Sequence, residues 1–149
     1  MCVLSSVYMR RKVDSLPNKD DITFIIGGKT YTKKYSDTVL DGKLYIDMLL
    51  IAQYTDMKIS GSESSVKFTA DNDNYLRFED GGTEAVINGS MVELGGTAMV
   101  SKDRCLIPYD FLTKAVGNGL RFILDTETNT VKVDRRMYAT DNDDVFIPV

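Results

Sequence analysis

The amino-acid sequence predicts an α+β fold, made mostly of antiparallel β-sheet and containing two short helices. First, runs of β-branched and aromatic residues with period two recur along the chain, separated by Gly-Gly, Asp-Gly and Asn-Gly turns. Second, only residues 46–54 and 108–117 space their apolar side chains as a helix does. Third, 43% of the 149 residues are hydrophobic, which is enough to build the core of one domain.

The first predicted element is a hairpin in the stretch ITFIIGGKTYTKKY, with its turn at Gly27-Gly28. The same letters contain the Gly-Lys-Thr of a phosphate-binding loop. That loop needs another glycine five residues before Gly28, where Thr23 stands, and it must lead into a helix. The residues that follow Lys29-Thr30 alternate as a strand does, so we favour the hairpin turn.

The first helix is predicted over Ile46 to Tyr54, because Ile46, Leu49, Leu50 and Tyr54 then share one face. Asp47 near its start suits the positive end of the helix dipole. The stretches MKIS and SVKFTA return to period two and are separated by the polar turn GSES, which predicts a pair of strands.

Residues 75–100 are predicted to form a meander of strands. The runs YLRFE, EAVI and SMVEL are divided by turns at Asp80-Gly81-Gly82 and Asn88-Gly89. Asn88-Gly89-Ser90 is formally a glycosylation sequon, but Asn-Gly between two strands is first of all a hairpin turn.

The second helix is the clearer one. Pro108 fits its first turn, Asp110 adds favourable charge there, and Gly117 suits a left-handed cap at its end. Its apolar stripe consists of Phe111, Leu112, Ala115 and Val116. The runs LRFIL and TVKVD then predict a final hairpin.

The chain repeats one order of elements. The same interval separates Leu44 from Cys105 and Ile46 from Ile107, and a slightly longer one separates Val66 from Val131. We therefore expect two β-α-β-β units, over about 21–70 and 75–134, that pair their sheets in one pseudo-symmetric core of a single domain, 21–134. Every repeated position is an apolar residue, a cap or a turn, so the repeat predicts a scaffold and not two copies of a reactive site.

Both ends of the sequence are expected to lie outside this domain. Residues 1–20 contain an apolar stretch followed by Arg10, Arg11 and Lys12, which indicates either a flexible or weakly helical tail or the end of a signal or anchor helix. Residues 135–149 form a polar tail that ends in VFIPV, a candidate edge strand. No run approaches the roughly 20 apolar residues that span a bilayer.

The pattern resembles the copper amine oxidase N-terminal-like family, whose members are often called stalk domains. The second unit carries the resemblance through Arg104, Ile107-Pro108, Phe111-Leu112, Gly117, Phe122, Asp125 and Val131-Lys132-Val133. The first unit carries it through Gly42-Lys43, Ile46, Leu49-Leu50, Met57-Lys58-Ile59 and Val66. The resemblance covers about residues 21–134 and implies a non-catalytic module of secreted or envelope proteins of Gram-positive bacteria.

The resemblance does not bring an oxidase with it. Those enzymes hold copper through histidines in a separate domain, and this chain has no histidine. A three-imidazole copper site, a histidine general base and a Ser-His-Asp triad are therefore all excluded, and we expect no cofactor. Cys2 and Cys105 form no Cys-x-x-Cys pair, so a zinc site is not indicated, and Cys105 is expected to be a small buried hydrophobe.

Charge excludes another class of function. With 18 basic and 22 acidic residues the net charge is −4, and no stretch combines Lys or Arg with aromatic residues as nucleic-acid binders do. We therefore expect no nucleic-acid partner, and a membrane partner only through an anchor.

Three short motifs and one pair of glutamates are further candidate sites. Ser64 to Lys67 has Ser-x-x-Lys spacing, which needs a helix to place the amine beneath the hydroxyl, whereas this stretch alternates as a strand does. Asp71–Asn74 and Thr140–Asp144 gather oxygen ligands for calcium but lack the EF-hand pattern, so solvated turns are favoured over weak calcium binding. Glu79 and Glu93 are the pair considered for a carboxylate-dependent hydrolase.

An interaction surface is the remaining candidate site. Tyr31, Tyr35 and Tyr109 are not obvious core residues, and aromatic rings bind sugars and peptides readily. The leading hypothesis is a non-catalytic spacer or adhesion module of the cell envelope or secreted space that contacts a wall polymer or a protein through its sheet or edge strands. The alternative is a glycan- or peptidoglycan-binding accessory domain, and a hydrolase is the third. The sequence does not indicate the oligomeric state.

Overall fold

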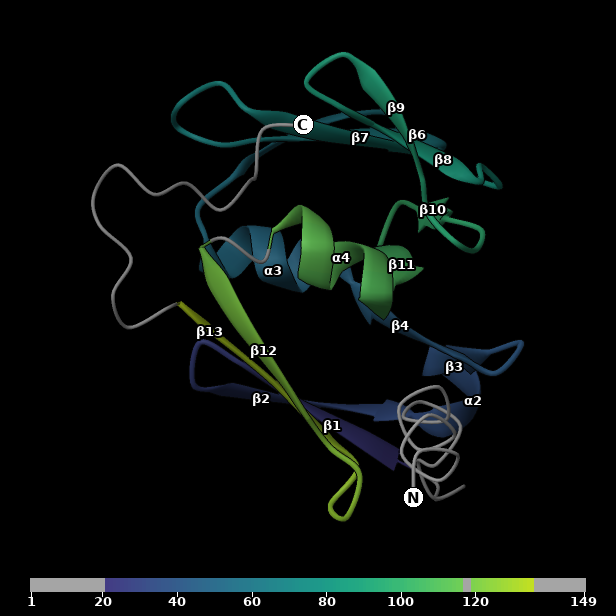
Figure 1. Ribbon diagram of the computed structural model, residues 1–149, viewed down its shortest axis with the longest axis vertical. Helices are drawn as coiled ribbons and strands as arrows, with labels where there is room; N and C mark the ends of the chain where they lie inside the picture. The colour runs from purple at the N-terminus through teal and green to yellow at the C-terminus, as the bar shows by residue number, and fades with distance from the viewer. Residues whose placement is uncertain (1–20, 117–118, 136–149) are drawn as a thin grey trace, which may run out of the picture.

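The computed structural model describes residues 21–116 and 119–135, which form three β-sheets and three short helices (Figure 1). The β1 sheet contains, in spatial order, β12 (Leu120–Asp125), β13 (Thr130–Arg135), β1 (Asp21–Ile26) and β2 (Lys29–Lys34). The β4 sheet contains β10 (Met99–Ser101), β11 (Arg104–Pro108), β4 (Lys43–Asp47) and β3 (Val39–Leu40). The β7 sheet contains β5 (Lys58–Gly61), β6 (Ser65–Thr69), β7 (Tyr75–Glu79), β8 (Glu84–Ile87) and β9 (Ser90–Glu93).

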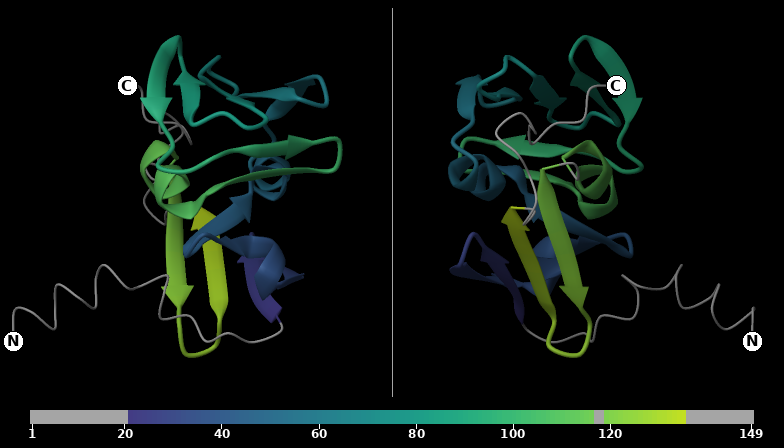
Figure 2. Two further views of the ribbon diagram at one scale, coloured as in Figure 1. Left: turned by 90° about the vertical axis from the view of Figure 1, so that its right-hand side faces the viewer. Right: turned by 60° about the vertical axis from the view of Figure 1, so that its left-hand side comes forward.

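The elements form layers. The β1 sheet and the β7 sheet lie at opposite ends of the molecule, and α3 (Met48–Tyr54), α4 (Tyr109–Ala115) and the β4 sheet lie between them (Figures 1 and 2). All strand pairs are antiparallel except β1 with β13, which is parallel. The predicted α+β class with mostly antiparallel strands is confirmed. Within the described residues, no helix is long and apolar enough to cross a membrane.

The number of helices differs from the expected two. The additional helix, α2 (Tyr35–Thr38), is a single turn that directly follows β2. Its last residue, Thr38, is buried and donates a hydrogen bond from Oγ1 to the Lys34 carbonyl at 3.0 Å. One turn contains too few residues to show a helical period, so the hydrophobic pattern gave no signal for it.

The two halves of the domain have the same order of elements, β4-α3-β5-β6 and β11-α4-β12-β13. β4 and β11 pair directly, with Ile46 opposite Ile107, so two positions matched by the sequence repeat meet at the centre of the β4 sheet. The pairing crosses between the halves elsewhere too, because β1 pairs with β13 and β6 pairs with β7. Each half therefore contributes strands to sheets that the other half completes.

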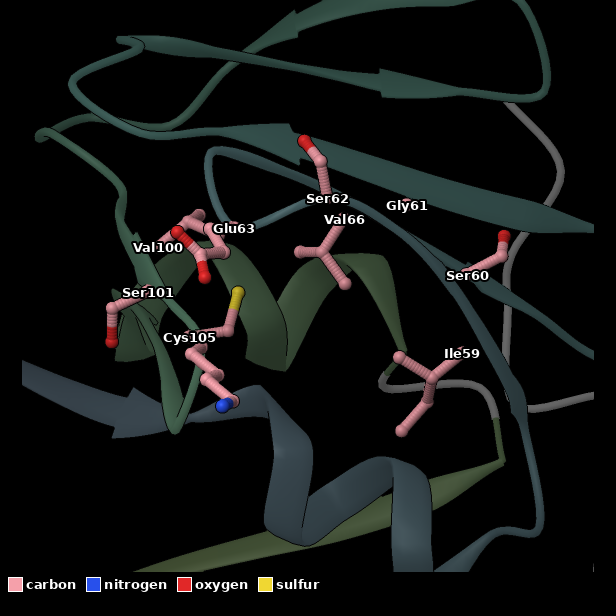
Figure 3. Close-up of a pocket in the computed structure, with 10 residues that line it drawn as sticks. Ile59, Ser60, Gly61, Ser62, Glu63, Val66, Val100, Ser101 and Cys105 are labelled. Carbon is pink, nitrogen blue, oxygen red and sulfur yellow. The ribbon is translucent and has the colours of Figure 1, made fainter.

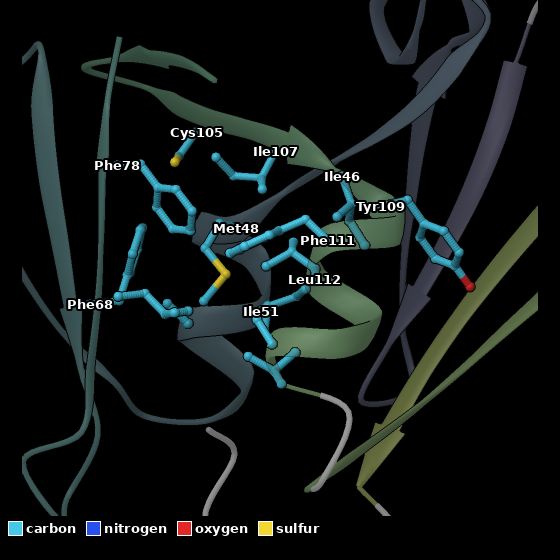
Figure 4. Close-up of a cluster of buried hydrophobic side chains, with 14 of the residues drawn as sticks. Ile46, Met48, Ile51, Phe68, Phe78, Cys105, Ile107, Tyr109, Phe111 and Leu112 are labelled. Atoms are coloured by element: carbon cyan, nitrogen blue, oxygen red, sulfur yellow. The ribbon is translucent and has the colours of Figure 1, made fainter. Parts of the chain in front are cut away.

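A single hydrophobic core connects the three layers (Figure 4). Phe78 lies at its centre and makes two edge-to-face contacts. Its ring centroid lies 6.1 Å from that of Phe68 on one side and 6.0 Å from that of Phe111 of α4 on the other. Cys105 is 1% exposed, which confirms the expectation of a small buried hydrophobe. The predicted stripe of α4 is also confirmed, since Phe111, Leu112, Ala115 and Val116 are all buried.

The predicted buried face of the first helix is wrong. The helix begins at Met48, and its buried residues are Met48, Ile51 and Ala52, whereas Leu49, Leu50 and Tyr54 are half-buried. The reason is that Ile46 belongs to strand β4, where it pairs with β11, so the helical period starts two residues later than expected.

The ends of the helices agree partly with the sequence. Asp47 is the N-cap of α3. Pro108 is the last residue of β11 and directly precedes α4, so Pro108 lies just before the first turn of that helix and not within it. Asp110 lies in the first turn of α4 as expected. Gly117, the expected cap, lies outside the described residues, as do the tails 1–20 and 136–149.

The predicted hairpin turns are confirmed. Gly27 and Gly28, with φ of 58° and 83°, connect β1 to β2, which are consecutive antiparallel strands. Asn88 and Gly89, with φ of 50° and 89°, connect β8 to β9 in the same way. No helix follows Gly27-Gly28, so the backbone there is not that of a phosphate-binding loop.

Candidate functional site

A hollow of about 280 Å³ lies between the β5–β6 turn and the β10–β11 turn (Figure 3). It is an open groove and not an enclosed cavity. Its residues come from two parts of the chain that are far apart in sequence: Ile59, Ser60, Gly61, Ser62, Glu63, Val66, Val100, Ser101, Lys102 and Cys105. We call it the β5 groove.

The floor of the β5 groove is apolar. Val66, Val100 and Cys105 are 7%, 6% and 1% exposed, and their side chains belong to the core. Burial raises the pKa of the Cys105 thiol, and the nearby Asp47 carboxylate raises it further. The thiol therefore stays protonated at neutral pH and does not act as a nucleophile.

The rim of the β5 groove is polar. It carries the hydroxyls of Ser60, Ser62 and Ser101 and two opposite charges, those of Glu63 and Lys102. An apolar floor surrounded by a few polar groups is the usual make-up of a binding site, because the floor supplies burial and the rim supplies orientation.

One wall of the groove is a free strand edge. β5 is the outermost strand of the β7 sheet among the described residues, and all four of its residues are exposed. The Ser62 N–H donates to the Ser65 carbonyl at 2.7 Å, and in an antiparallel pair the bonded residues alternate. Lys58 and Ser60 therefore bond to β6, whereas the backbone N–H and C=O groups of Ile59 and Gly61 point to the open side.

Ile59 marks the place where the core is incomplete. It lies opposite the fully buried Phe68, and therefore on the inner face of the sheet, yet it is 48% exposed. The opposite edge strand, β9, has an exposed apolar residue too, Met91 at 62%, but Met91 pairs with Val86 on the outer face of the sheet. Of the two edges of the β7 sheet, β5 is thus the one that combines an inward, half-exposed apolar side chain with backbone groups that no described strand pairs.

Gly61 holds the end of β5 in place. Its φ of +126° is a conformation that L side chains rarely adopt, and a Cβ there would clash with the Ser65 carbonyl oxygen. We expect Gly61→Ala to lower the free energy of unfolding by about 1–3 kcal/mol because of this strain and clash. Urea denaturation measures the loss. Gly28→Ala is the control for the strain of positive φ alone, since Gly28 has a φ of +83° but a Cβ there meets nothing within 4 Å, so its loss should be smaller. An equal loss in the two variants would contradict the assignment.

The tyrosines considered for an interaction surface do not form one exposed face. Tyr31 on β2 and Tyr35 on α2 are half-buried and pack against the core. Tyr109 is only 7% exposed, so its expected exposure is wrong. It is the first residue of α4, and its ring makes an edge-to-face contact with Phe122 at 5.7 Å. Burial raises the pKa of its phenol to about 12.

A second, smaller hollow of about 190 Å³ lies beside Asp47. Lys33, Asp37, Asp103 and Arg104 bring charges of both signs to it. Asp47 itself has a structural role: its Oδ1 accepts hydrogen bonds from the backbone N–H groups of Leu49 and Cys105, each at 3.0 Å. One oxygen therefore caps α3 and fixes the start of β11. Burial raises the pKa of this carboxyl, against the opposing effect of these two hydrogen bonds and of the Lys33 and Arg104 charges.

The other candidate residues lie apart from both hollows. Glu79 and Glu93 are exposed, on β7 and β9, with β8 between them. Asp71–Asn74 form the turn between β6 and β7, and within the described ranges no group of three or more Asp, Glu, Cys or His side chains is placed to hold a metal ion. Ser64 directly precedes the extended strand β6, and Lys67 lies within it, which does not give the helical spacing of a Ser-x-x-Lys site. Thr140–Asp144 lie outside the described residues.

Sequence reasoning missed the β5 groove. The stretch MKIS predicts the strand that the structure has as β5. A pattern of four residues, however, does not distinguish a strand at the edge of a sheet from one at its centre. The groove needs Val100, Lys102 and Cys105, which are distant in sequence from β5. The pairing of β4 with β11 and the hydrogen bond from the Val100 N–H to Asp80 Oδ1 hold them there. The one available signal was Ile59, a large apolar residue in a strand with polar neighbours.

One comparison with known proteins identifies a family. Residues 25–133 match the family model of the copper amine oxidase N-terminal domain. No match was found among curated proteins or among solved structures. The N-terminal domain of copper amine oxidase is a non-catalytic module. Because the matched range covers most of its 149 residues, this chain belongs to the copper amine oxidase N-terminal domain family.

Proposed function

We propose that this chain is a non-catalytic interaction module of the cell envelope or secreted space, and that it binds an extended segment of a protein partner at the β5 edge. The observation that carries the proposal is that Ile59 points inward, is 48% exposed, and lies beside unpaired backbone groups and an apolar hollow. In β-strand addition, the backbone of the incoming segment bonds to the free edge while alternate side chains fill adjacent pockets. The β5 groove offers both features.

The proposed partner is an extended peptide with an apolar side chain at alternate positions. One such side chain would cover Val66, Val100 and Cys105, and the backbone would pair with Ile59 and Gly61. Ser60, Ser62, Glu63 and Lys102 would then select among sequences at the rim. The location in the envelope or secreted space rests on the family resemblance of the sequence and is part of the proposal.

The test compares two exposed apolar residues on the two edges of the same sheet. A displayed library of random heptapeptides is selected on the purified chain, and the selected peptides are titrated into ¹⁵N-labelled protein. We expect Ile59→Lys to weaken binding at least about tenfold, since a charge would then stand at the apolar hollow. Met91→Lys, the matched control on β9, should bind as the wild type does, and neither change should unfold the domain.

Two results would contradict the proposal. One is a selected peptide that perturbs the amides of β9 or of Tyr31 and Tyr35 but not those of Ile59 and Gly61. The other is retention of the chain on purified cell wall that free glycan abolishes and Ile59→Lys does not affect, which would favour the glycan-binding alternative.

A further inference from the structure

We infer that the hollow beside Asp47 is a binding site for a free α-amino acid with a small apolar side chain. We call it the Asp47 hollow. The inference goes beyond the proposed function, because this hollow and the β5 groove have no lining residue in common. Its volume of about 190 Å³ is smaller than the roughly 300 Å³ of the smallest sites for drug-sized ligands, so it suits a small molecule.

One part of the Asp47 hollow is apolar. It consists of Phe24 on β1, Leu50 on α3 and Leu106 on β11. Phe24 and Leu106 are 2% and 5% exposed, and Leu50 is half-buried. Leu106 lies directly opposite Asp47 in the β4 sheet, so the apolar part adjoins the carboxylate. An apolar side chain of a ligand would be covered here.

Two oxygen atoms beside this apolar part suit an ammonium group. Asp47 Oδ1 accepts the two backbone hydrogen bonds, whereas Oδ2 accepts none from the described residues and remains accessible to solvent. Thr38 is 3% exposed, and its hydroxyl donates to the Lys34 carbonyl, so the lone pairs of its oxygen are still available. An ammonium group has three N–H donors and could bond to both oxygens.

Two cations on the rim suit a carboxylate. Lys33 on β2 and Arg104 at the start of β11 both line the hollow. Burial raises the pKa of the Asp47 carboxyl, and the charges of Lys33 and Arg104 oppose that rise, so both lie near it. Neither forms an ion pair within residues 21–116 and 119–135. Their charges are therefore available to the carboxylate of a ligand, which Arg104 could bind through two N–H groups.

The combination of charges favours a zwitterion. Asp37 and Asp103 also line the hollow, so three carboxylates and two cations surround it. In the described ranges these carboxylates are not placed to hold a metal ion together. An anionic ligand would be repelled by Asp47, and a simple amine would leave Lys33 and Arg104 without a partner. A free α-amino acid carries an ammonium group, a carboxylate and a side chain on one carbon, and so matches all three parts of the hollow.

The test titrates glycine, L-alanine, L-valine and L-leucine separately into the ¹⁵N-labelled chain at pH 7. We expect saturable binding of at least one of the three apolar amino acids with a Kd of about 1 mM or below, and weaker binding of glycine. The largest shifts should fall on the Leu49 and Cys105 amides, because both donate to Asp47. The Ile59 and Gly61 amides of the β5 groove should not shift.

A matched pair of variants tests the ammonium site. Asp47→Asn keeps an oxygen for the two backbone N–H groups but replaces Oδ2 by an NH₂ group, so we expect a folded protein that binds L-valine at least about tenfold more weakly. Asp110→Asn removes the same charge from the first turn of α4, outside the hollow, and should bind as the wild type does.

Ligand analogues test both charged ends on the wild-type chain. N-acetyl-L-valine lacks the ammonium group and should not bind. L-valinamide lacks the carboxylate and should bind at least about tenfold more weakly than L-valine. In Arg104→Gln that difference between L-valinamide and L-valine should largely disappear, because the variant has lost the group that distinguishes them.

Three results would overturn the inference. The first is the absence of saturable shifts at Leu49 and Cys105 with all four amino acids at about 10 mM. The second is equal affinity of the wild type and the folded Asp47→Asn variant, and the third is equal affinity of the wild type for L-valine and N-acetyl-L-valine. None of these results bears on the proposed function, which is measured at Ile59 and Gly61.

Discussion

Replacing Phe78 by alanine is expected to lower the free energy of unfolding by about 3–5 kcal/mol. Phe78 is fully buried, and it is the ring through which the β7 sheet contacts α4, with Phe68 on one side and Phe111 on the other at 6.0–6.1 Å. The loss combines the transfer energy of the ring, the cavity that remains and two edge-to-face contacts. Denaturation by urea, followed by circular dichroism, measures it.

The matched control is Phe122→Ala. Phe122 also has an edge-to-face partner, Tyr109 at 5.7 Å, but it is only partly buried, on the outermost strand of the β1 sheet among the described residues. Its replacement removes one such contact and less buried area, so the loss should be clearly smaller. Equal losses at the two positions would contradict the central place that the structure gives to Phe78.

The second large effect is expected at Asp47. Asp47→Ala removes the single oxygen that accepts hydrogen bonds from Leu49 and Cys105, and we expect a loss of about 2–4 kcal/mol, the sum of a lost helix cap and an unsatisfied backbone N–H. Asp47→Asn is the control. An amide oxygen can accept the same two hydrogen bonds, so this variant should stay within about 1 kcal/mol of the wild type at neutral pH.

The pH dependence at Asp47 has a definite sign. Its pKa is raised from 3.8 by burial, so in the window above pH 3.8 the folded protein binds this proton more strongly than the unfolded chain does. Stability from this group is therefore fully present below pH 3.8 and is lost as pH rises through the raised pKa. The stability of the wild type relative to Asp47→Asn should fall with rising pH in this window and then level off. A rise over the same window would show that the two hydrogen bonds and the charges of Lys33 and Arg104 outweigh burial.

The parts of the fold that depend on local pattern could be predicted from the sequence. Gly27-Gly28 and Asn88-Gly89 identify hairpin turns because few other residues tolerate positive φ, and Phe111 to Val116 identify a helix by their period. The interval that relates Ile46 to Ile107 marked two residues that prove to be paired neighbours. These signals involve residues close in sequence, or an order of elements that the sequence predicts twice.

The parts that depend on tertiary pairing could not be predicted. Nothing local shows that β1 lies parallel to β13, or that Ile46 belongs to a strand and not to the helix that follows it. Tyr109 is a surface candidate in the sequence because nothing local marks it as a core residue, whereas the adjacent β12 covers it with Phe122. The β5 groove likewise exists only because the two halves of the domain bring the β5–β6 turn and the β10–β11 turn together.

The most direct test of the central claim, that this chain binds extended segments at the β5 edge, is a map of backbone amide shifts on titration with a library-selected peptide. The account predicts that the largest shifts fall on Ile59, Gly61 and the groove residues Val100 and Ser101, and that Ile59→Lys abolishes them while Met91→Lys does not. Saturable binding whose largest shifts lie on another sheet, and which Ile59→Lys leaves unchanged, would contradict it.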